Sequence, residues 1–219
     1  MRTRFDAQLA HLNDSLVEMG GMVEQAIADA NRALIERDAA RAEKAIAMDN
    51  EIDFLEKEIE SLCLKIIMQQ QPVAGDLRLV SSVLKITTDL ERIGDHAADI
   101  SGITLRICDK PYVKKPEDYF PQMAAATAKM VAESIDAFVK KDLALARSVI
   151  AYDGTVNALF KKVKKALLEL ISQNADDSDQ AIDLIMIAKY FERIGDHATN
   201  IAEWVIFSLT GMHKDTQVM

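Results

Sequence analysis

The feature that most constrains this chain is an internal duplication. DLERIGDHAADI at 89–100 and YFERIGDHATNI at 190–201 are identical at eight of twelve positions, with an offset of 101 residues. A second pair of blocks, at 38–49 and 142–153, is identical at six of twelve positions with an offset of 104. Two separated segments therefore recur in the same order, and we expect the chain to fold as two copies of one unit.

Each copy is predicted to contain three helices. Apolar residues recur every three or four positions, for example in the row Ile86, Leu90, Ile93, Ala97 and Ile100 and in its repeat Ile187, Phe191, Ile194, Ala198 and Ile201. Asp38 and Asp142 are residues of the N-cap type, and further breaks are indicated at Gln71-Pro72 and in the polar run 174–179. The expected helices have about 25 to 35 residues each.

The domain plan follows from the prolines. Three of the four prolines lie within 111–121, where they would interrupt a helix, so this segment is predicted to be a linker. The expected fold is all-α, a tandem duplication of two antiparallel three-helix bundles at 1–110 and 122–212, followed by a polar tail at 213–219.

Composition narrows the class of protein. Hydrophobic residues make up 49%, and there are only eight glycines and 5% aromatic residues, which is typical of a helical chain. The net charge of −9 argues against nucleic-acid binding. Cys63 and Cys108 lie in apolar helical patterns and are predicted to be buried thiols of a reducing compartment. No signal core or membrane-spanning stretch is present, so a cytoplasmic protein is expected, reaching the membrane only through a membrane protein.

The longest identical block carries a row of acids. With a spacing of four residues, the row comprises Glu91, Asp95 and Asp99 in the first copy and Glu192, Asp196 and Asn200 in the second. Residues at this spacing share one face of a helix, here the face opposite the apolar stripe, and a solvated helix face is the simpler interpretation. However, like charges four residues apart cost a helix about 0.2 to 0.5 kcal/mol per pair. Since the row recurs in both copies, a functional role is favoured.

A second pair of acids is expected beside this row. Asp49 and Asp53 have the same spacing on the preceding helix, and in the second copy Asp153 is kept while Asn157 replaces its partner. Carboxylates on adjacent helices supply oxygen ligands, which suit Mg²⁺, Mn²⁺, Ca²⁺ or iron better than zinc. The sequence therefore favours a metal site in each half.

The neighbours of the acids leave two questions open. For His96 and His197, a capping or interhelix hydrogen bond is favoured over metal ligation. Arg92 and Arg193 are predicted to pair with nearby acids, with an anion held jointly by metal and arginine as the alternative.

Enzyme classes fit poorly. A ferritin-like di-iron site needs Glu-x-x-His on facing helices, whereas Glu91 and His96 are five residues apart. The sequence has no Gly-rich phosphate loop and no nucleophile elbow. No catalytic residue is predicted.

Together these motifs resemble the PhoU family of accessory regulators of bacterial phosphate uptake. The resemblance covers nearly the whole chain and rests on QQPVAGDLR at 70–78, the two ERIGDH blocks and ATNIAE at 198–203. It implies PhoU-type bundles without catalytic activity that bind a metal, with a multinuclear iron cluster favoured over Mn, Mg, Ca or Zn. By position, the implied metal residues are Glu91, Asp95, Asp99, Asp49 and Asp53 in the first half and Glu192, Asp196 and Asp153 in the second. Asn157 and Asn200 stand where a carboxylate would complete the second row, so the second cluster is expected to be weaker, smaller or absent.

The resemblance also implies a function. It is that of a negative regulator of phosphate uptake and of the phosphate-starvation regulon, acting as an adaptor between the ATPase of the phosphate ABC transporter and a sensor histidine kinase, and expected to form a homodimer. The alternative is a metal-free helical scaffold whose acidic faces bind a basic protein surface. Metal content would separate the two.

Overall fold

The helical prediction is confirmed by the computed structural model, which describes residues 2–110, 119–213 and 216–217. Within these ranges the chain forms six long helices: α1 (Arg2–Glu36), α2 (Ala39–Gln70), α3 (Ala74–Ile107), α4 (Tyr119–Lys140), α5 (Leu143–Gln173) and α6 (Ser178–Thr210). A short 3₁₀ turn, η1 (Ala175–Asp177), joins α5 to α6, and β1 (Met212–His213) pairs antiparallel with β2 (Thr216–Gln217). Among the residues described, no helix combines the length and the apolar character needed to cross a membrane.

The predicted helix breaks are confirmed. The Asp38 carboxylate accepts a hydrogen bond of 3.0 Å from the backbone N–H of Arg41, and Asp142 caps α5 in the same way through the N–H groups of Ala144 and Leu145. These bonds satisfy N–H groups that have no partner inside the helix. Gln71 ends α2 in a left-handed conformation with φ of 48°.

The segments predicted to be a linker and a tail contain secondary structure. The end of the predicted linker is helical, and the predicted tail contributes to a short antiparallel strand pair. Of the predicted linker 111–121, residues 111–118 lie outside the described part of the chain, whereas 119–121 form the first turn of α4. Proline is tolerated in that turn because its missing N–H would have had no helical partner. At 22 residues, α4 is shorter than the predicted range. In the predicted tail, the His213 ring stacks on Trp204 with the ring centroids 4.1 Å apart.

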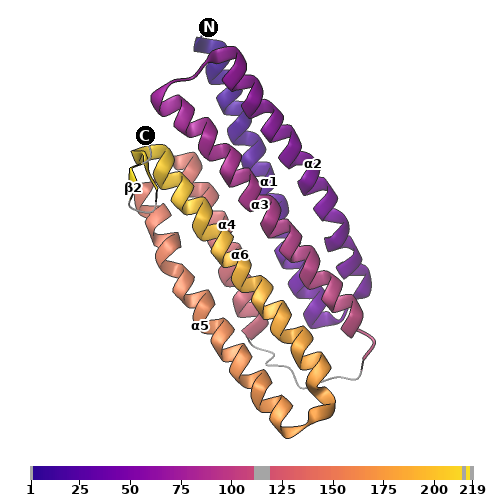
Figure 1. Cartoon of the computed structure of the whole chain (residues 1–219). Coiled ribbons are helices and arrows are strands. Elements are labelled where there is room, and N and C mark those ends of the chain that lie inside the picture. Colours follow the sequence, from indigo (N-terminus) through magenta and orange to yellow (C-terminus); the bar gives the residue numbers. More distant parts are fainter. Residues whose placement is uncertain (1, 111–118, 214–215, 218–219) are drawn as a thin grey trace.

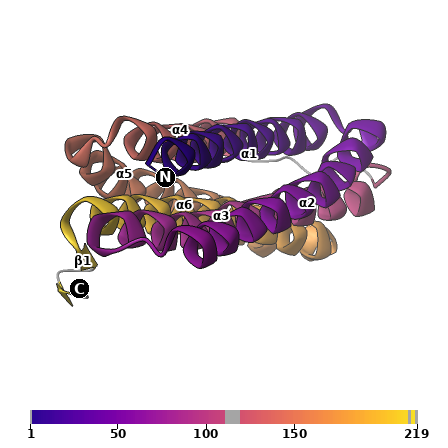
Figure 2. The ribbon, with the colours of Figure 1, turned by 90° about the horizontal axis from the view of Figure 1, so that it is seen from above.

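The two bundles lie side by side along their length. Helices α2, α3, α6 and α5 form one layer in that order, and α1 and α4 form a second layer against it (Figures 1 and 2). The central contact between the halves joins α3 to α6, with further contacts between α1 and α4. The duplication therefore produces an elongated molecule in which the two copies share one boundary.

A continuous apolar core crosses that boundary. Every residue of both predicted stripes on α3 and α6 is fully buried, and these stripes belong to the same cluster as the buried side chains of the other four helices. Helix α3 contacts α1, α2 and α6 at once. Little of its circumference is left for water, and this determines the environment of its acidic row.

Candidate metal centre

Three carboxylates of the first half converge at the seam between α2 and α3. One oxygen from each of Asp49, Asp53 and Asp95 lies within 4.8 Å of the other two, and this is the one such acidic, histidine or cysteine group found among the described residues. Gly94 permits the approach, because a Cβ at that position would lie 3.4 Å from Oδ1 of Asp49 and 3.0 Å from Cδ1 of Ile52. The packing of α2 against α3 thus brings together carboxylates that are up to 46 residues apart in the sequence, at positions 49 and 95.

The acidic row is less exposed than the sequence suggested. The Glu91 side chain is 15% exposed and Asp95 is 33% exposed, whereas Asp99 is 49% exposed. A fully solvated face is therefore wrong for the first two residues. The reason is that α2 packs against α3 beside the row, which a single-helix pattern cannot reveal.

Several oxygens at this seam lack donors. Oδ1 of Asp49, Oδ1 of Asp53 and Oε2 of Glu91 are buried and accept no hydrogen bond from any described group. Burial, followed by the charges of Asp95, Asp53 and Asp99, raises the pKa of Asp49 to about 6. Burial and the charge of Asp95 raise the pKa of Glu91 to about 7, although Arg92 acts in the opposite direction. Crowded carboxylates without donors favour a bound proton or cation.

The donor set fits a metal ion of the kind predicted. All the converging ligand atoms are carboxylate oxygens, which hard cations such as Mg²⁺, Mn²⁺, Ca²⁺ and iron prefer. Arg92 lies at the rim, with its guanidinium 2.7 Å from Asp95 and 3.4 Å from Glu91. It neutralises part of the charge of the row from the solvent side, since its side chain is 55% exposed.

The equivalent seam between α5 and α6 gives its acids more partners inside the protein, although Oδ1 of Asp153 is also buried without a hydrogen-bond donor among the described residues. The Asn157 amide donates a hydrogen bond of 2.6 Å to Asp153 Oδ2. Glu192 forms an ion pair with Lys189, and Arg193 lies 3.3 Å from Asp196. Burial and the charge of Asp196 still raise the pKa of Asp153, against the hydrogen bond from Asn157. The second half therefore offers fewer free oxygens to a cation.

The structure places His197 and Asn200 at the boundary between the halves. Nδ1 of His197 lies 2.8 Å from Oδ1 of Asp89 on α3, and the Asn200 amide donates to the same oxygen at 3.2 Å. Asn200 is thus engaged by the other half of the molecule, and His197 adopts the interhelix alternative.

A related arrangement surrounds His96. Its ring lies 5.4 Å from the Tyr190 ring and 5.5 Å from the His197 ring, measured between centroids. Tyr190 hydrogen-bonds with Asp99, and Nδ1 of His96 is 3.6 Å from Oδ2 of Asp99. Burial, followed by His197, lowers the pKa of His96, while Asp99 acts to raise it.

The contacts of Asp89 and Tyr190 across the boundary were not predicted from the sequence. The two residues occupy equivalent positions in the two repeated blocks and are among the four positions at which those blocks differ, as are Asp99 and Asn200. In the structure the pairs cross over, Asp89 with Asn200 and Tyr190 with Asp99. The positions at which the two repeats differ were the sequence signal that could have indicated these contacts.

The fold and the α2–α3 seam are those of a duplicated helical protein that has one three-carboxylate cluster among its described residues. The model of the family described as "PhoU domain" matches residues 16–104 and again 120–205, so this chain belongs to the PhoU family. Two relatives named phosphate-specific transport system accessory protein PhoU homolog are each 36% identical. The one from Pseudomonas aeruginosa is matched over 95% of this chain and 86% of its own length, and the one from Clostridium acetobutylicum over 98% of both.

Solved structures agree with the fold. The crystal structure of PhoU from Pseudomonas aeruginosa superposes with a TM-score of 0.91 at 35% identity, over 95% of this chain and all of that one. The structure of the phosphate transport system regulatory protein PhoU from Streptococcus pneumoniae gives 0.88 at 26% identity, over 97% of this chain and all of that one.

Proposed function

We propose that this protein is a non-enzymatic accessory regulator that restrains phosphate uptake and holds the phosphate-starvation regulon off when phosphate is plentiful. The observation that carries the proposal is the convergence of Asp49, Asp53 and Asp95 on one seam, in a chain whose PhoU-family relatives are named accessory proteins of phosphate transport. The fold supplies long helical faces for partners, and the seam supplies a place for a cation between two of those helices.

The metal would be held by the first-half carboxylates. Asp49 and Asp53 would bind from α2, with Asp95 and Glu91 from α3 and Asp99 at the margin. When bound, a hard cation, with an iron cluster as the first choice, supplies positive charge that neutralises the row. The carboxylates then fix the spacing of α2 and α3, so that the surface presented to partners depends on metal.

Elemental analysis of protein purified without chelators tests this part. We expect the wild-type chain to contain metal in a stoichiometric amount. The alternative, a metal-free scaffold with acidic faces toward a basic partner, predicts that the chain is free of stoichiometric metal.

The partners proposed are the ATPase of the phosphate ABC transporter and a sensor histidine kinase, contacted in the cytoplasm by a homodimer. Co-purification should detect either partner and should weaken as salt rises where acidic faces take part. Light scattering tests the dimer. Duplex DNA should not compete, since the chain carries a net charge of −9.

Phosphate import in a deletion strain gives the sharpest test of the regulatory role. A restraining adaptor predicts that, in phosphate-rich medium, import of labelled phosphate rises and starvation genes switch on when the protein is lost. An assembly scaffold predicts that import falls. A fall in import would exclude negative regulation.

A further inference from the structure

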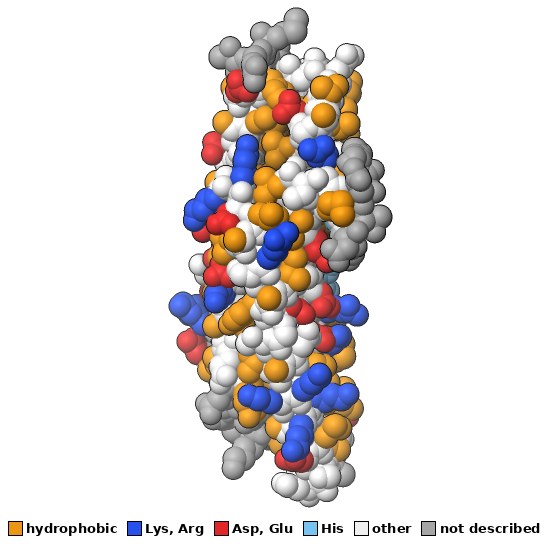
Figure 3. Space-filling model, turned by 90° about the vertical axis from the view of Figure 1, so that its left-hand side faces the viewer, with side chains coloured by type: hydrophobic (Ala, Val, Ile, Leu, Met, Phe, Trp, Pro, Cys, Tyr) orange, Lys and Arg blue, Asp and Glu red, His pale blue; other side chains and the backbone are white. Residues whose placement is uncertain are grey.

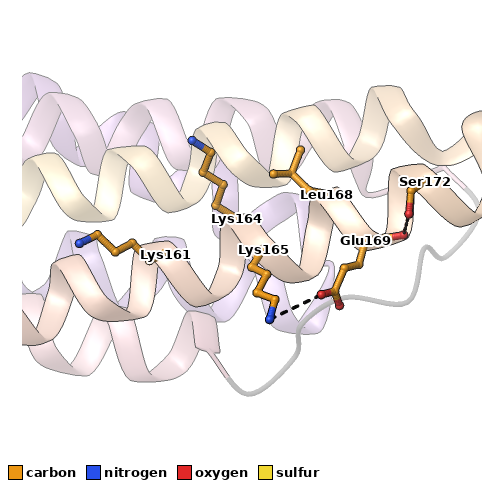
Figure 4. A pocket seen from close by; sticks show the side chains of 6 residues that line it. All are labelled: Lys161, Lys164, Lys165, Leu168, Glu169 and Ser172. Carbon is orange, nitrogen blue, oxygen red and sulfur yellow. Dashed lines mark hydrogen bonds and ion pairs between the residues drawn. The ribbon is translucent and has the colours of Figure 1, made fainter.

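The second half carries a basic surface that the metal seam does not explain. Four exposed lysines lie within a five-residue segment of α5, namely Lys161, Lys162, Lys164 and Lys165, although the net charge of the chain is −9. The face of the molecule that includes α5 shows Lys and Arg side chains gathered toward its lower end (Figure 3). A shallow hollow of about 360 Å³ is lined there by Lys161, Lys164, Lys165, Leu168, Glu169 and Ser172. Figure 4 shows Lys164 and Leu168 extending to one side of α5, and Lys165 and Glu169 to the other.

Exposed apolar side chains accompany these lysines. Leu168 is 52% exposed, and on α6 Ile182 is 54% and Met186 is 41% exposed. Helices α5 and α6 pack together and are joined by the short η1, so Leu168 and Ile182 lie at the same level, near that end of the bundle. We call Lys161, Lys164, Lys165, Leu168, Ile182 and Met186 the α5–α6 surface.

The first half lacks this run of lysines although it has the same helices. At the positions equivalent to the lysines, α2 carries Lys57, Glu60 and Ser61, and α3 carries Ser81 and Lys85 in place of the two apolar residues. The hollow beside α2 is lined by residues of both charges together with His11 and Ser15 of α1. Leu64 of α2, the counterpart of Leu168, is 55% exposed, so exposed apolar residues occur in both halves. The run of lysines is therefore the property of this half that the fold does not require.

We propose that the α5–α6 surface docks an acidic amphipathic helix of a protein partner. Two packed antiparallel helices offer a face on which a third helix can lie, and its apolar residues would contact Leu168, Ile182 and Met186. Its carboxylates would meet the lysine ammonium groups, and this complementarity would set orientation and speed association. The proposal rests on the proposed function only in that an adaptor needs a surface for a partner.

A helix is favoured over an anionic membrane by the acids around the surface. Glu169, Asp176 and Asp179 are exposed within a few residues of it along α5, η1 and α6. A planar anionic leaflet would press against these carboxylates as well as the lysines, whereas a single helix covers a narrower strip of the surface.

The test uses a fluorescent synthetic peptide of about 18 residues with leucines at i, i+3, i+4 and i+7 and glutamates elsewhere. We expect the full chain to bind it, with affinity that falls as salt rises. The triple variant K161E/K164E/K165E should bind at least about tenfold more weakly, as expected for the loss and reversal of three contacts at the surface. The matched control K57E/K65E/K85E changes the net charge equally in the first half and should bind as the wild type does. Circular dichroism checks that both variants remain helical.

Two results would overturn the proposal. One is peptide binding that is absent from the wild type or equal in the two variants. The other is lysine-dependent binding to vesicles of phosphatidylglycerol and phosphatidylcholine in place of the peptide. Metal content and phosphate import are measured on the same variants. Normal metal and normal import with no peptide binding would refute only the docking surface, whereas reduced import in the deletion strain would refute the proposed function alone.

Discussion

The two halves of this protein share one three-helix plan but treat their carboxylates differently. In the first half, Asp53 and Glu91 keep buried oxygens without hydrogen-bond donors from the described residues. In the second, Asn157 stands in place of Asp53 and donates to Asp153. Lys189 stands in place of Thr88 and pairs with Glu192. These two substitutions give Asp153 and Glu192 partners inside the protein, although Oδ1 of Asp153 still lacks a donor. Among the described residues, the first half is thus left with more buried carboxylate oxygens that have no donor.

The largest expected effect is the loss of metal from the first half. Replacing Glu91 by Gln and Asp95 by Asn should remove most bound metal, because both changes delete anionic oxygens from the α2–α3 seam. The equivalent pair, Glu192→Gln with Asp196→Asn, should remove much less. Elemental analysis with circular dichroism as the control for folding measures both. Equal losses from the two halves would show that the seams are equivalent after all.

A gain of function in the second half sharpens the same comparison. The double variant Asn157→Asp with Lys189→Thr removes both internal partners and recreates the first-half pattern. We expect it to raise metal affinity at the α5–α6 seam by about tenfold or more, as added anionic ligands do for hard cations. Titration calorimetry in a background lacking Glu91 and Asp95 isolates this site. Unchanged affinity would mean that features beyond these two positions separate the halves.

The boundary between the halves offers a comparison of stability. Asp89 is 13% exposed and accepts from both His197 and Asn200, whereas its counterpart Tyr190 pairs with the half-exposed Asp99. Asp89→Ala should therefore lower the free energy of unfolding by about 1 to 3 kcal/mol, because it leaves two donors without their acceptor. Tyr190→Phe should cost about 0.5 to 1.5 kcal/mol, since it removes one hydrogen bond. Urea unfolding measures both, and a reversed order would contradict this view of the boundary.

Much of this fold could be predicted from the sequence, because local rules decide helices. The apolar stripes, the caps at Asp38 and Asp142 and the residues of the acidic rows all follow from spacing within one helix. What the sequence did not reveal depends on how helices sit together. The partial burial of Glu91 needs α2 beside α3, and the crossed pairs of Asp89 and Tyr190 need one half placed against the other. The start of α4 at Tyr119 was missed because the prolines were assigned to a linker, although Pro121 fits a first helical turn.

The smallest expected effect is a pH dependence of the metal-free protein. Burial and neighbouring acids raise the pKa of Asp49 from 3.8 to about 6 and that of Glu91 from 4.5 to about 7. Between the ordinary and the raised pKa of each group, the folded chain holds a proton that the unfolded chain has released. The contribution of these two groups to stability is therefore greatest below about pH 4 and falls as the pH rises toward about 7. In chelator-treated protein, the urea midpoint should therefore fall between about pH 5 and about pH 7.5 by an amount that Asp49→Asn with Glu91→Gln reduces. Asp153→Asn should reduce it less, because the Asn157 hydrogen bond opposes the rise in the pKa of Asp153. If neither variant changed the dependence of the urea midpoint on pH, its origin would lie outside both seams. If Asp153→Asn had the larger effect, the second half would contribute more to this dependence than the first.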